Sequence, residues 1–218
     1  RDPKEYGREK TISLASLSGS SDVESLSDIG LFTQAGYLTI KAVEYGNTVF
    51  LDYPNLEVKR AMAQLYTELL LKGKVAGQVG AGDIVRVLNN DDPEEVFHIL
   101  NRLFTAIDYQ SYPVTDEASV RASIQVYLAG AGLDPKVERY NAHGRSDLEV
   151  NVGARLWVFE LKTAHEGKSA DAALQEAINQ LTSRRYGEQD AVGKLERVAL
   201  VFSLRERRFV RWAAVPET

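Results

Sequence analysis

Three charged residues, Asp147, Glu160 and Lys162, lie in two neighbouring segments that are predicted to be β-strands. Residues 147–152 alternate Val and Leu with polar residues, and residues 156–161 form an apolar run that contains one carboxylate. Two carboxylates and an ammonium on one sheet face suit a hard divalent cation, which prefers carboxylate oxygens and keeps several waters. The residue types therefore point to chemistry that is assisted by a metal ion.

The turn between the two segments predicts how the strands pair. A two-residue connection that begins with Gly153 is a favoured hairpin turn, and it makes Val152 face Arg155. Counting outward places Asp147 directly opposite Glu160. Directly opposed Cβ atoms are about 4.5–5.5 Å apart, where like charges repel each other. A positive group is therefore expected between the two carboxylates.

Two interpretations of this hairpin differ in its burial. On the surface of the protein, its acids would be solvated and would need no partner. The opposite face instead predicts a buried central strand, because it carries Trp157, Phe159 and Leu161. Charges buried in such a strand are costly unless they are paired or bind a metal ion. Alternation along the strand places Lys162 on the same face as Glu160, where its ammonium can be the expected positive group.

The elements around the hairpin follow from periodicity, caps and turn residues. Ser21 or Asp22 is expected to cap the first helix, and Asn55 and Asp92 are expected to cap two later ones. Helices are predicted over residues 22–33, 56–71, 83–88, 93–107, 116–129 and 170–186, and further strands over residues 37–43, 48–53, 137–140, 198–203 and 208–215.

The chain is predicted to fall into three parts. Residues 1–22 are polar and Ser-rich and are expected to be a linker or tail. Residues 23–112 form a helical module with a β-hairpin, and Tyr112-Pro113 marks the seam to an α/β domain at residues 113–218. Residues 73–82 carry four glycines but lack the Gly-Lys-Ser/Thr ending of a phosphate loop, so they are predicted to be a flexible connection.

Composition limits the class of protein. The 218 residues are 44% hydrophobic, which suffices for one substantial core or two modest ones. The chain has no Cys, so disulfides and thiolate zinc sites are not expected. We find no apolar run of about 18 residues, so a membrane span is not expected either. A cytoplasmic protein is therefore expected. The chain starts at Arg1 without a signal-peptide pattern, which suggests a piece of a longer protein.

The charge is unevenly distributed. The whole chain has a net charge of -5, but residues 181–211 hold eight Lys/Arg against four Asp/Glu. A locally basic end is suited to phosphate contact, although a solvated helix face and strand edge would explain it as well. Arg184, Arg185 and Tyr186 are the residues that we expect to contact nucleic acid.

The pattern of Asp147 followed after twelve residues by Glu160-Leu161-Lys162 resembles the PD-(D/E)XK nuclease superfamily. The predicted order of helix, strand, two-stranded hairpin, helix and strand is also the order of that superfamily's core. The resemblance implies an α/β (α+β) fold with a restriction-endonuclease-like core, in which helices flank a mixed central sheet. The small helical module with the β-hairpin would precede it.

The chain looks still more like a bacterial family in which such a nuclease domain follows an AAA-like ATPase domain. The similar stretches are residues 30–41 with 52–58, residues 144–147 with 159–162, and residues 177–181 with the Arg185-Tyr186 pair. The resemblance assigns the first stretch to the tail of the ATPase region. Because the chain has no Walker-type phosphate loop, its nucleotide-binding part would be missing here.

The resemblance also implies roles for individual residues. Asp147 and Glu160 would hold Mg²⁺ or Mn²⁺, and Lys162 would be the catalytic lysine. Glu117 would be a helix carboxylate near the metal, although an acid in the first turn of a helix is also favoured without any function. Gln180 would be the helix residue beside the site.

The expected function is a metal-dependent nuclease that hydrolyses phosphodiester bonds of DNA, with an ATPase portion as a candidate regulator. The alternative is a catalytically silent module with a nuclease fold that binds nucleic acid or protein. In a third interpretation, Lys162 only neutralises a buried carboxylate. The sequence leaves open DNA or RNA, endo or exo cleavage, the sequence preference and whether the chain forms a homo-oligomer.

Overall fold

The structure is a computed structural model, and it describes residues 6, 10–18, 27–74, 76–141, 144–165, 167–184 and 193–216. The chain contacts divide it into two compact units. The smaller unit is Gly7–Met62, and the larger one is Ala63–Thr218 together with Tyr6. Each unit is described by itself. None of the helices in the described ranges combines the length and the apolar content that a membrane span requires.

The smaller unit is built around a three-stranded antiparallel sheet with the strand order β1-β3-β2. Its hairpin of β2 and β3 confirms the hairpin predicted in this module, with strands expected at residues 37–43 and 48–53. The elements of this unit are β1 (Lys10–Ser13), α1 (Leu14–Ser18), α2 (Asp28–Gln34), β2 (Thr39–Glu44) and β3 (Thr48–Asp52).

The start of this unit differs from the prediction. Residues 1–22 were expected to be a linker or tail, yet β1 and α1 lie within them. β1 pairs with β3, with Lys10 opposite Leu51, so a strand far along the chain stabilises it. Such a short strand leaves no local periodicity in the sequence. The cap predicted at Ser21 or Asp22 falls outside the described residues, and α2 is capped by Ser27, whose Oγ accepts a hydrogen bond from Gly30 N at 3.1 Å.

The helix predicted after Asn55 is confirmed as α3 (Leu56–Leu70). Asn55 Oδ1 accepts a hydrogen bond from Val58 N at 2.9 Å, as a cap residue should. The boundary between the two units falls within α3, between Met62 and Ala63. After α3 the chain stays in the larger unit.

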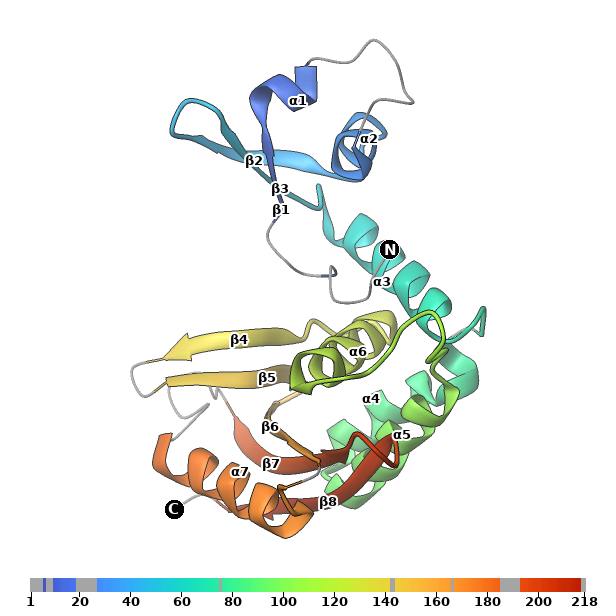
Figure 1. Ribbon diagram of the computed structural model, residues 1–218, viewed down its shortest axis with the longest axis vertical. Helices are drawn as coiled ribbons and strands as arrows, with labels where there is room; N and C mark the ends of the chain where they lie inside the picture. The colour runs from blue at the N-terminus through green and yellow to red at the C-terminus, as the bar shows by residue number, and fades with distance from the viewer. Residues whose placement is uncertain are drawn as a thin grey trace. The chain divides into compact units, whose positions relative to one another are not determined.

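The larger unit contains a five-stranded mixed sheet with the order β4-β5-β6-β7-β8 (Figure 1). β6 and β7 are parallel, and the other neighbouring pairs are antiparallel. Its elements are the short helix η3 (Ala76–Val79), α4 (Ala81–Asn90), α5 (Pro93–Ala106), α6 (Glu117–Gly130), β4 (Lys136–Asn141), β5 (Gly144–Val152), β6 (Arg155–Ala164), α7 (Ala170–Arg184), β7 (Lys194–Ser203) and β8 (Arg208–Val215).

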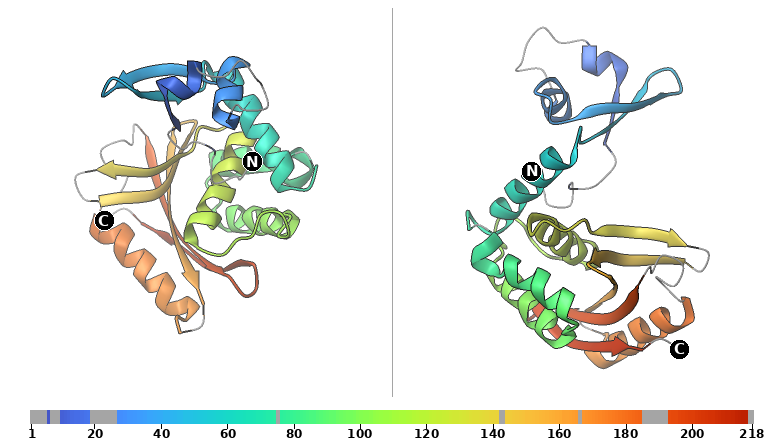
Figure 2. Two further views of the ribbon diagram at one scale, coloured as in Figure 1. Left: turned by 45° about the horizontal axis from the view of Figure 1, so that its top comes forward. Right: turned by 180° about the vertical axis from the view of Figure 1, so that it is seen from behind.

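Helices cover both faces of this sheet (Figure 2). On one face, α7 packs Ala177 and Leu181 against Val158 and Ala199. On the other face, a larger core joins residues of α4, α5 and α6 to the opposite side chains of the strands, including Trp157. The α/β fold class expected from the sequence, with a mixed central sheet flanked by helices, is therefore confirmed.

The seam predicted at Tyr112-Pro113 lies inside the larger unit. The helices before it, α4 and α5, bury apolar stripes in the same core as the sheet, so they pack as part of the α/β layers. Asp92 caps α5 as predicted, since its carboxylate accepts a hydrogen bond from Glu95 N at 3.0 Å. A cap residue fixes where a helix starts, but it carries no information on which sheet the helix will cover.

Candidate active site

The β5–β6 hairpin has the register that was predicted from its turn. Val152 faces Arg155, and Gly153 in the turn has φ +58°, a conformation that glycine adopts without strain. The ladder ends at Leu148 opposite Phe159, one position short of the predicted pair of Asp147 and Glu160. The residues that follow this pair are Asp147 on β5 and Glu160 on β6, and both belong to the candidate site.

At this point Asp147 binds β6 through its side chain. Leu161 N donates a hydrogen bond to Asp147 Oδ2 at 2.8 Å. Asp147 Oδ1 accepts a second hydrogen bond from Arg121 Nη1 at 3.3 Å. The carboxylate is thereby fixed between β6 and α6, and the residue is only 9% exposed.

Lys162 is the positive group that the carboxylates require. Its Nζ lies 2.8 Å from Glu160 Oε1 and 3.9 Å from Glu117 Oε1. It also donates a hydrogen bond to the carbonyl oxygen of Leu161 at 3.1 Å. Glu160 is 1% exposed and Lys162 is 7% exposed, so this is a buried site and the surface interpretation of the hairpin is wrong.

Glu117 and Arg121 come from the first turns of α6. Asp116 caps this helix in a capping box with Ser119, which places Glu117 in the first turn. Arg121 follows Glu117 by four residues, so the two side chains share one face of the helix. Arg121 was not identified from the sequence: its spacing from Glu117 places it on the same helix face, but this spacing does not state which carboxylate its side chain reaches.

Burial and neighbouring charges shift the pKa values at the site. Loss of solvent, together with the charges of Asp147 and Glu117, raises the pKa of Glu160 to about 7 against the opposing effect of Lys162. Burial also raises the pKa of Glu117, although Lys162 acts in the opposite direction. Burial lowers the pKa of Lys162, but the hydrogen bond and charge of Glu160 outweigh it, so the net shift is upward. The ammonium is therefore held charged beside a carboxylate that protonates readily.

Gln180 and Arg184 lie together on α7, in a shallow groove of about 600 Å³. Gln180 Oε1 is buried and has no hydrogen-bond partner among the described residues. No hydrogen bond found in this part of the structure joins Gln180 to Asp147, Glu160 or Lys162. Arg185 and Tyr186, the other predicted nucleic-acid contacts, lie outside the described residues.

The site offers two buried carboxylates, Asp147 and Glu160, to a divalent cation. Among the described residues, no three His, Cys, Asp or Glu side chains are placed to hold a metal ion by themselves. Asp147 and Glu160 nevertheless fit a two-carboxylate site, because Glu160 Oε2 is buried without a hydrogen-bond partner. An ion such as Mg²⁺ is commonly held by one or two carboxylates, with waters and substrate oxygens completing the shell.

Two comparisons relate this chain to known proteins. The chain is 28% identical over 188 residues to a protein of Azotobacter chroococcum mcd 1 described as "Uncharacterized protein in vnfD 5'region". The alignment covers 83% of this chain and 36% of that protein, so the chain spans about a third of its relative's length. Residues 115–212, from the start of α6 into β8, match the sequence model of the PD-(D/E)XK nuclease superfamily.

Proposed function

We propose that this chain is a metal-dependent nuclease that hydrolyses phosphodiester bonds of DNA. The proposal rests mainly on the buried group of Asp147, Glu160 and Lys162. It lies within the segment that resembles the PD-(D/E)XK nucleases, on a sheet of the corresponding fold. A buried acid that lacks a partner for one oxygen is unfavourable for stability alone, so a functional role for the group is the better explanation.

Asp147 and Glu160 would hold Mg²⁺ or Mn²⁺, and the buried Glu160 Oε2 without a hydrogen-bond partner is consistent with this role. When bound, such an ion lowers the pKa of a water ligand and polarises a phosphoryl oxygen. Arg121 would act as a positioning residue, because its guanidinium and Leu161 N together fix the orientation of the Asp147 carboxylate.

Lys162 would stabilise negative charge that develops during cleavage. Its ammonium has three donors, and Glu160 and the Leu161 carbonyl use two of them. The third is free to donate to the attacking water or to a phosphate oxygen, on the side where Glu117 lies at 3.9 Å. Since the net shift in the pKa of Lys162 is upward, the group stays protonated at neutral pH.

The groove on α7 is our candidate for contact with the nucleic acid beside the site. Gln180 offers a buried oxygen without a partner, and Arg184 lies in the same groove. Arg185 and Tyr186, which follow Arg184 in the sequence, are also proposed to contact the nucleic acid. An ATPase portion outside this chain is a further part of the proposal, and it rests on the resemblance alone. Whether the chain forms a homo-oligomer is left open by the sequence.

The proposal is tested by cleavage assays on purified variants. With Mg²⁺ or Mn²⁺, the wild type should cut linear or circular DNA, and Lys162→Ala and Asp147→Ala should each lose at least about 100-fold in rate, as expected when a charge-stabilising group is removed. Arg121→Ala should lose less, because it acts through Asp147. Lys136→Ala is the matched control, since this exposed lysine on β4 pairs only with Asp134 among the described residues. Equal activity of the wild type and Lys162→Ala would contradict the assignment.

One observation favours the silent-module alternative. Lys162 already neutralises Glu160 without a metal, and no three-ligand group is present in the described residues. Calorimetric titration with Mn²⁺ separates the two functions. A nuclease should show a saturable site that Glu160→Gln weakens at least about tenfold, whereas a silent module should show no such site.

A further inference from the structure

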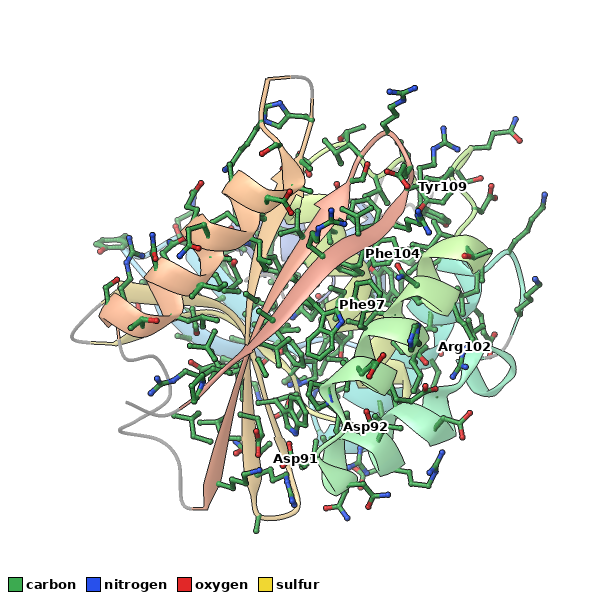
Figure 3. All side chains as sticks on the ribbon, turned by 90° about the horizontal axis from the view of Figure 1, so that it is seen from below. Asp91, Asp92, Phe97, Arg102, Phe104 and Tyr109 are labelled. Carbon is green, nitrogen blue, oxygen red and sulfur yellow. The ribbon has the colours of Figure 1, made fainter. Side chains whose placement is uncertain are left out.

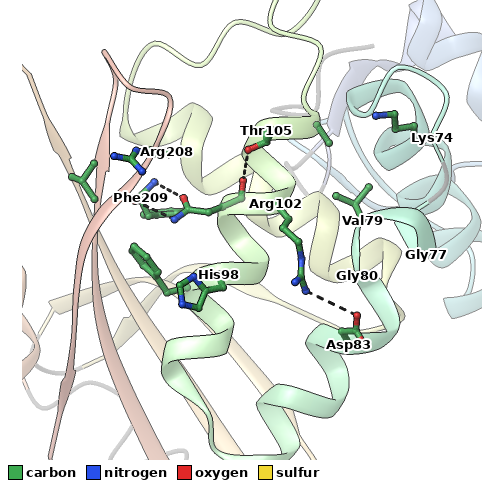
Figure 4. Close-up of a pocket in the computed structure, with 14 residues that line it drawn as sticks. Lys74, Gly77, Val79, Gly80, Asp83, His98, Arg102, Thr105, Arg208 and Phe209 are labelled. Carbon is green, nitrogen blue, oxygen red and sulfur yellow. Dashed lines mark hydrogen bonds and ion pairs between the residues drawn. The ribbon is translucent and has the colours of Figure 1, made fainter.

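A second cavity lies outside the candidate active site and shares no residue with it. Its volume is about 920 Å³, which is within the range of about 300–1,000 Å³ that is usual for small-molecule sites. Figure 4 shows it between the start of α4, the helix α5 and the start of β8. The residues that line it are Lys74, Gly77, Val79, Gly80, Asp83, Phe97, His98, Asn101, Arg102, Thr105, Ala106, Arg208, Phe209 and Val210.

The cavity has an apolar floor and a polar rim. Val79 and Phe209 are buried at 6% and 1% exposure, and Phe97 packs against the same core. Figure 3 places Phe97 on the inner side of α5 and Arg102 on its outer side. A cavity with an apolar floor and a polar rim suits a ligand that carries both a ring and a polar group.

Three cationic side chains, Lys74, Arg102 and Arg208, lie on the rim with a single carboxylate, Asp83. This basic lining is notable in a chain whose net charge is -5. Lys74 has no ion-pair partner among the described residues. The rim therefore favours an anion.

The ion pairs that Arg102 already makes are weak competitors for such an anion. Its guanidinium lies 4.0 Å from Asp83 and 3.5 Å from Glu95, and its side chain is 50% exposed. Exposed pairs of this kind contribute little to stability, because water screens the two charges. A phosphate, which guanidinium groups bind through two parallel hydrogen bonds, can replace them. Arg208 is held more firmly, by Glu206 at 2.7 Å.

Hydrogen bonds hold the floor of the cavity in place. Asn101 binds both backbone groups of Phe209: its Nδ2 donates to the carbonyl at 3.1 Å, and its Oδ1 accepts from the amide at 2.7 Å. Tyr127 Oη donates to the carbonyl of Val79 at 2.9 Å. Gly80, with φ +87°, leaves room for Arg102, whose Nη2 would lie 3.3 Å from a Cβ at position 80. A floor that is fixed before binding lowers the entropic cost of holding a ligand.

We propose that this cavity binds a nucleoside phosphate, with the phosphate on Lys74 and Arg102 and the base over the apolar floor. Inorganic phosphate would leave most of the 920 Å³ empty, and an uncharged ring would leave Lys74 without an ion-pair partner among the described residues. His98 and Thr105 on the rim can form hydrogen bonds with the sugar or the base. The site would be a small-molecule site additional to the cleavage centre.

The experiment is calorimetric titration of the full chain in EDTA with the four nucleoside 5′-monophosphates, with adenosine and with inorganic phosphate. EDTA removes metal-dependent binding at the active site. At least one nucleotide should bind at least about tenfold more tightly than adenosine or phosphate. Arg102→Ala and Lys74→Ala should each weaken that binding at least about tenfold, the effect expected for the loss of a charge-assisted hydrogen bond.

Two controls decide what a change in affinity means. Arg86→Ala should leave binding unchanged, because Arg86 also pairs with Asp83, at 3.7 Å, but does not line the cavity. Asp147→Ala should bind the nucleotide like the wild type. Absence of saturable nucleotide binding, equal binding of phosphate alone, or loss of binding in Asp147→Ala would each overturn the proposal. Near-ultraviolet circular dichroism of Arg102→Ala confirms its fold, and the cleavage assays are independent of all these outcomes.

Discussion

At the scale of single residues, Glu160 links the stability of the protein to pH. Its side chain is buried, one oxygen binds Lys162, and the other has no hydrogen-bond partner. Burial raises its pKa to about 7, whereas an unfolded Glu titrates near 4.5. The folded protein therefore binds a proton more tightly at this residue than the unfolded chain does.

This difference predicts a pH effect in the absence of metal. Because the folded-state pKa is raised, the contribution of Glu160 to the free energy of unfolding is complete below about pH 4.5 and is lost as the pH rises toward 7. The loss should reach at most about 3–4 kcal/mol, since the pKa rises from 4.5 to about 7 and each pKa unit corresponds to about 1.4 kcal/mol. Urea unfolding in EDTA between pH 5 and pH 8 measures it, with Glu160→Gln as the reference. Equal slopes for the two proteins would contradict the assignment.

The site residues on the β5–β6 hairpin were predictable from the sequence, whereas the contacts of the helix residues around them were not. Asp147, Glu160 and Lys162 lie on one hairpin, and the turn at Gly153 together with the period of two fixes their positions. Arg121 approaches from α6, and no rule of local geometry states which carboxylate a helix side chain will reach. The same limit applies to Gln180, whose surroundings depend on how α7 lies on the sheet.

At the scale of elements, the parallel pair β6 and β7 depends on a close backbone approach at its start. Lys194 N donates to the carbonyl oxygen of Ala154 at 2.9 Å, directly after the β5–β6 turn. A Cβ on Gly193 would overlap that carbonyl oxygen, so glycine is required here for space. The sequence predicted this strand only from residue 198, because three of the four residues 194–197 are charged and the continuous apolar run begins after them.

Gly193→Ala should therefore destabilise the larger unit by about 1–3 kcal/mol, the range for forced backbone shifts in a packed site. Gly82→Ala is the control, because a Cβ on Gly82 meets no atom within 4 Å and Ala favours a helix more than Gly by up to about 1 kcal/mol. Urea denaturation of both variants beside the wild type measures the difference. If Gly193→Ala were as stable as the wild type, the overlap of its Cβ with the Ala154 carbonyl oxygen would not limit stability.

At the scale of the whole molecule, packing decides which unit a helix belongs to, and the periodicity of the sequence cannot. The spacing of apolar residues located α4 and α5, yet Ile84 and Phe104 face the same core as Trp157 on β6. Their amphipathic pattern is equally compatible with a separate helical module. The sequence thus predicted the layers of the sheet and its helices, but the pairing of β1 and the reach of the larger core depend on contacts distant in sequence.

All buried residues of that core lie between Leu70 and Phe209, so the larger unit holds its own hydrophobic core. A fragment of residues 55–218 keeps α3 whole with its Asn55 cap, and should fold and keep the proposed metal site. It loses the contact of Tyr6 with Tyr66, whose ring centroids are 5.9 Å apart, and with it up to about 3 kcal/mol of unfolding free energy. Tyr6→Ala in the full chain should show a similar loss in urea. A fragment that stays unfolded while Tyr6→Ala folds would mean that the larger unit requires residues before position 55 other than Tyr6.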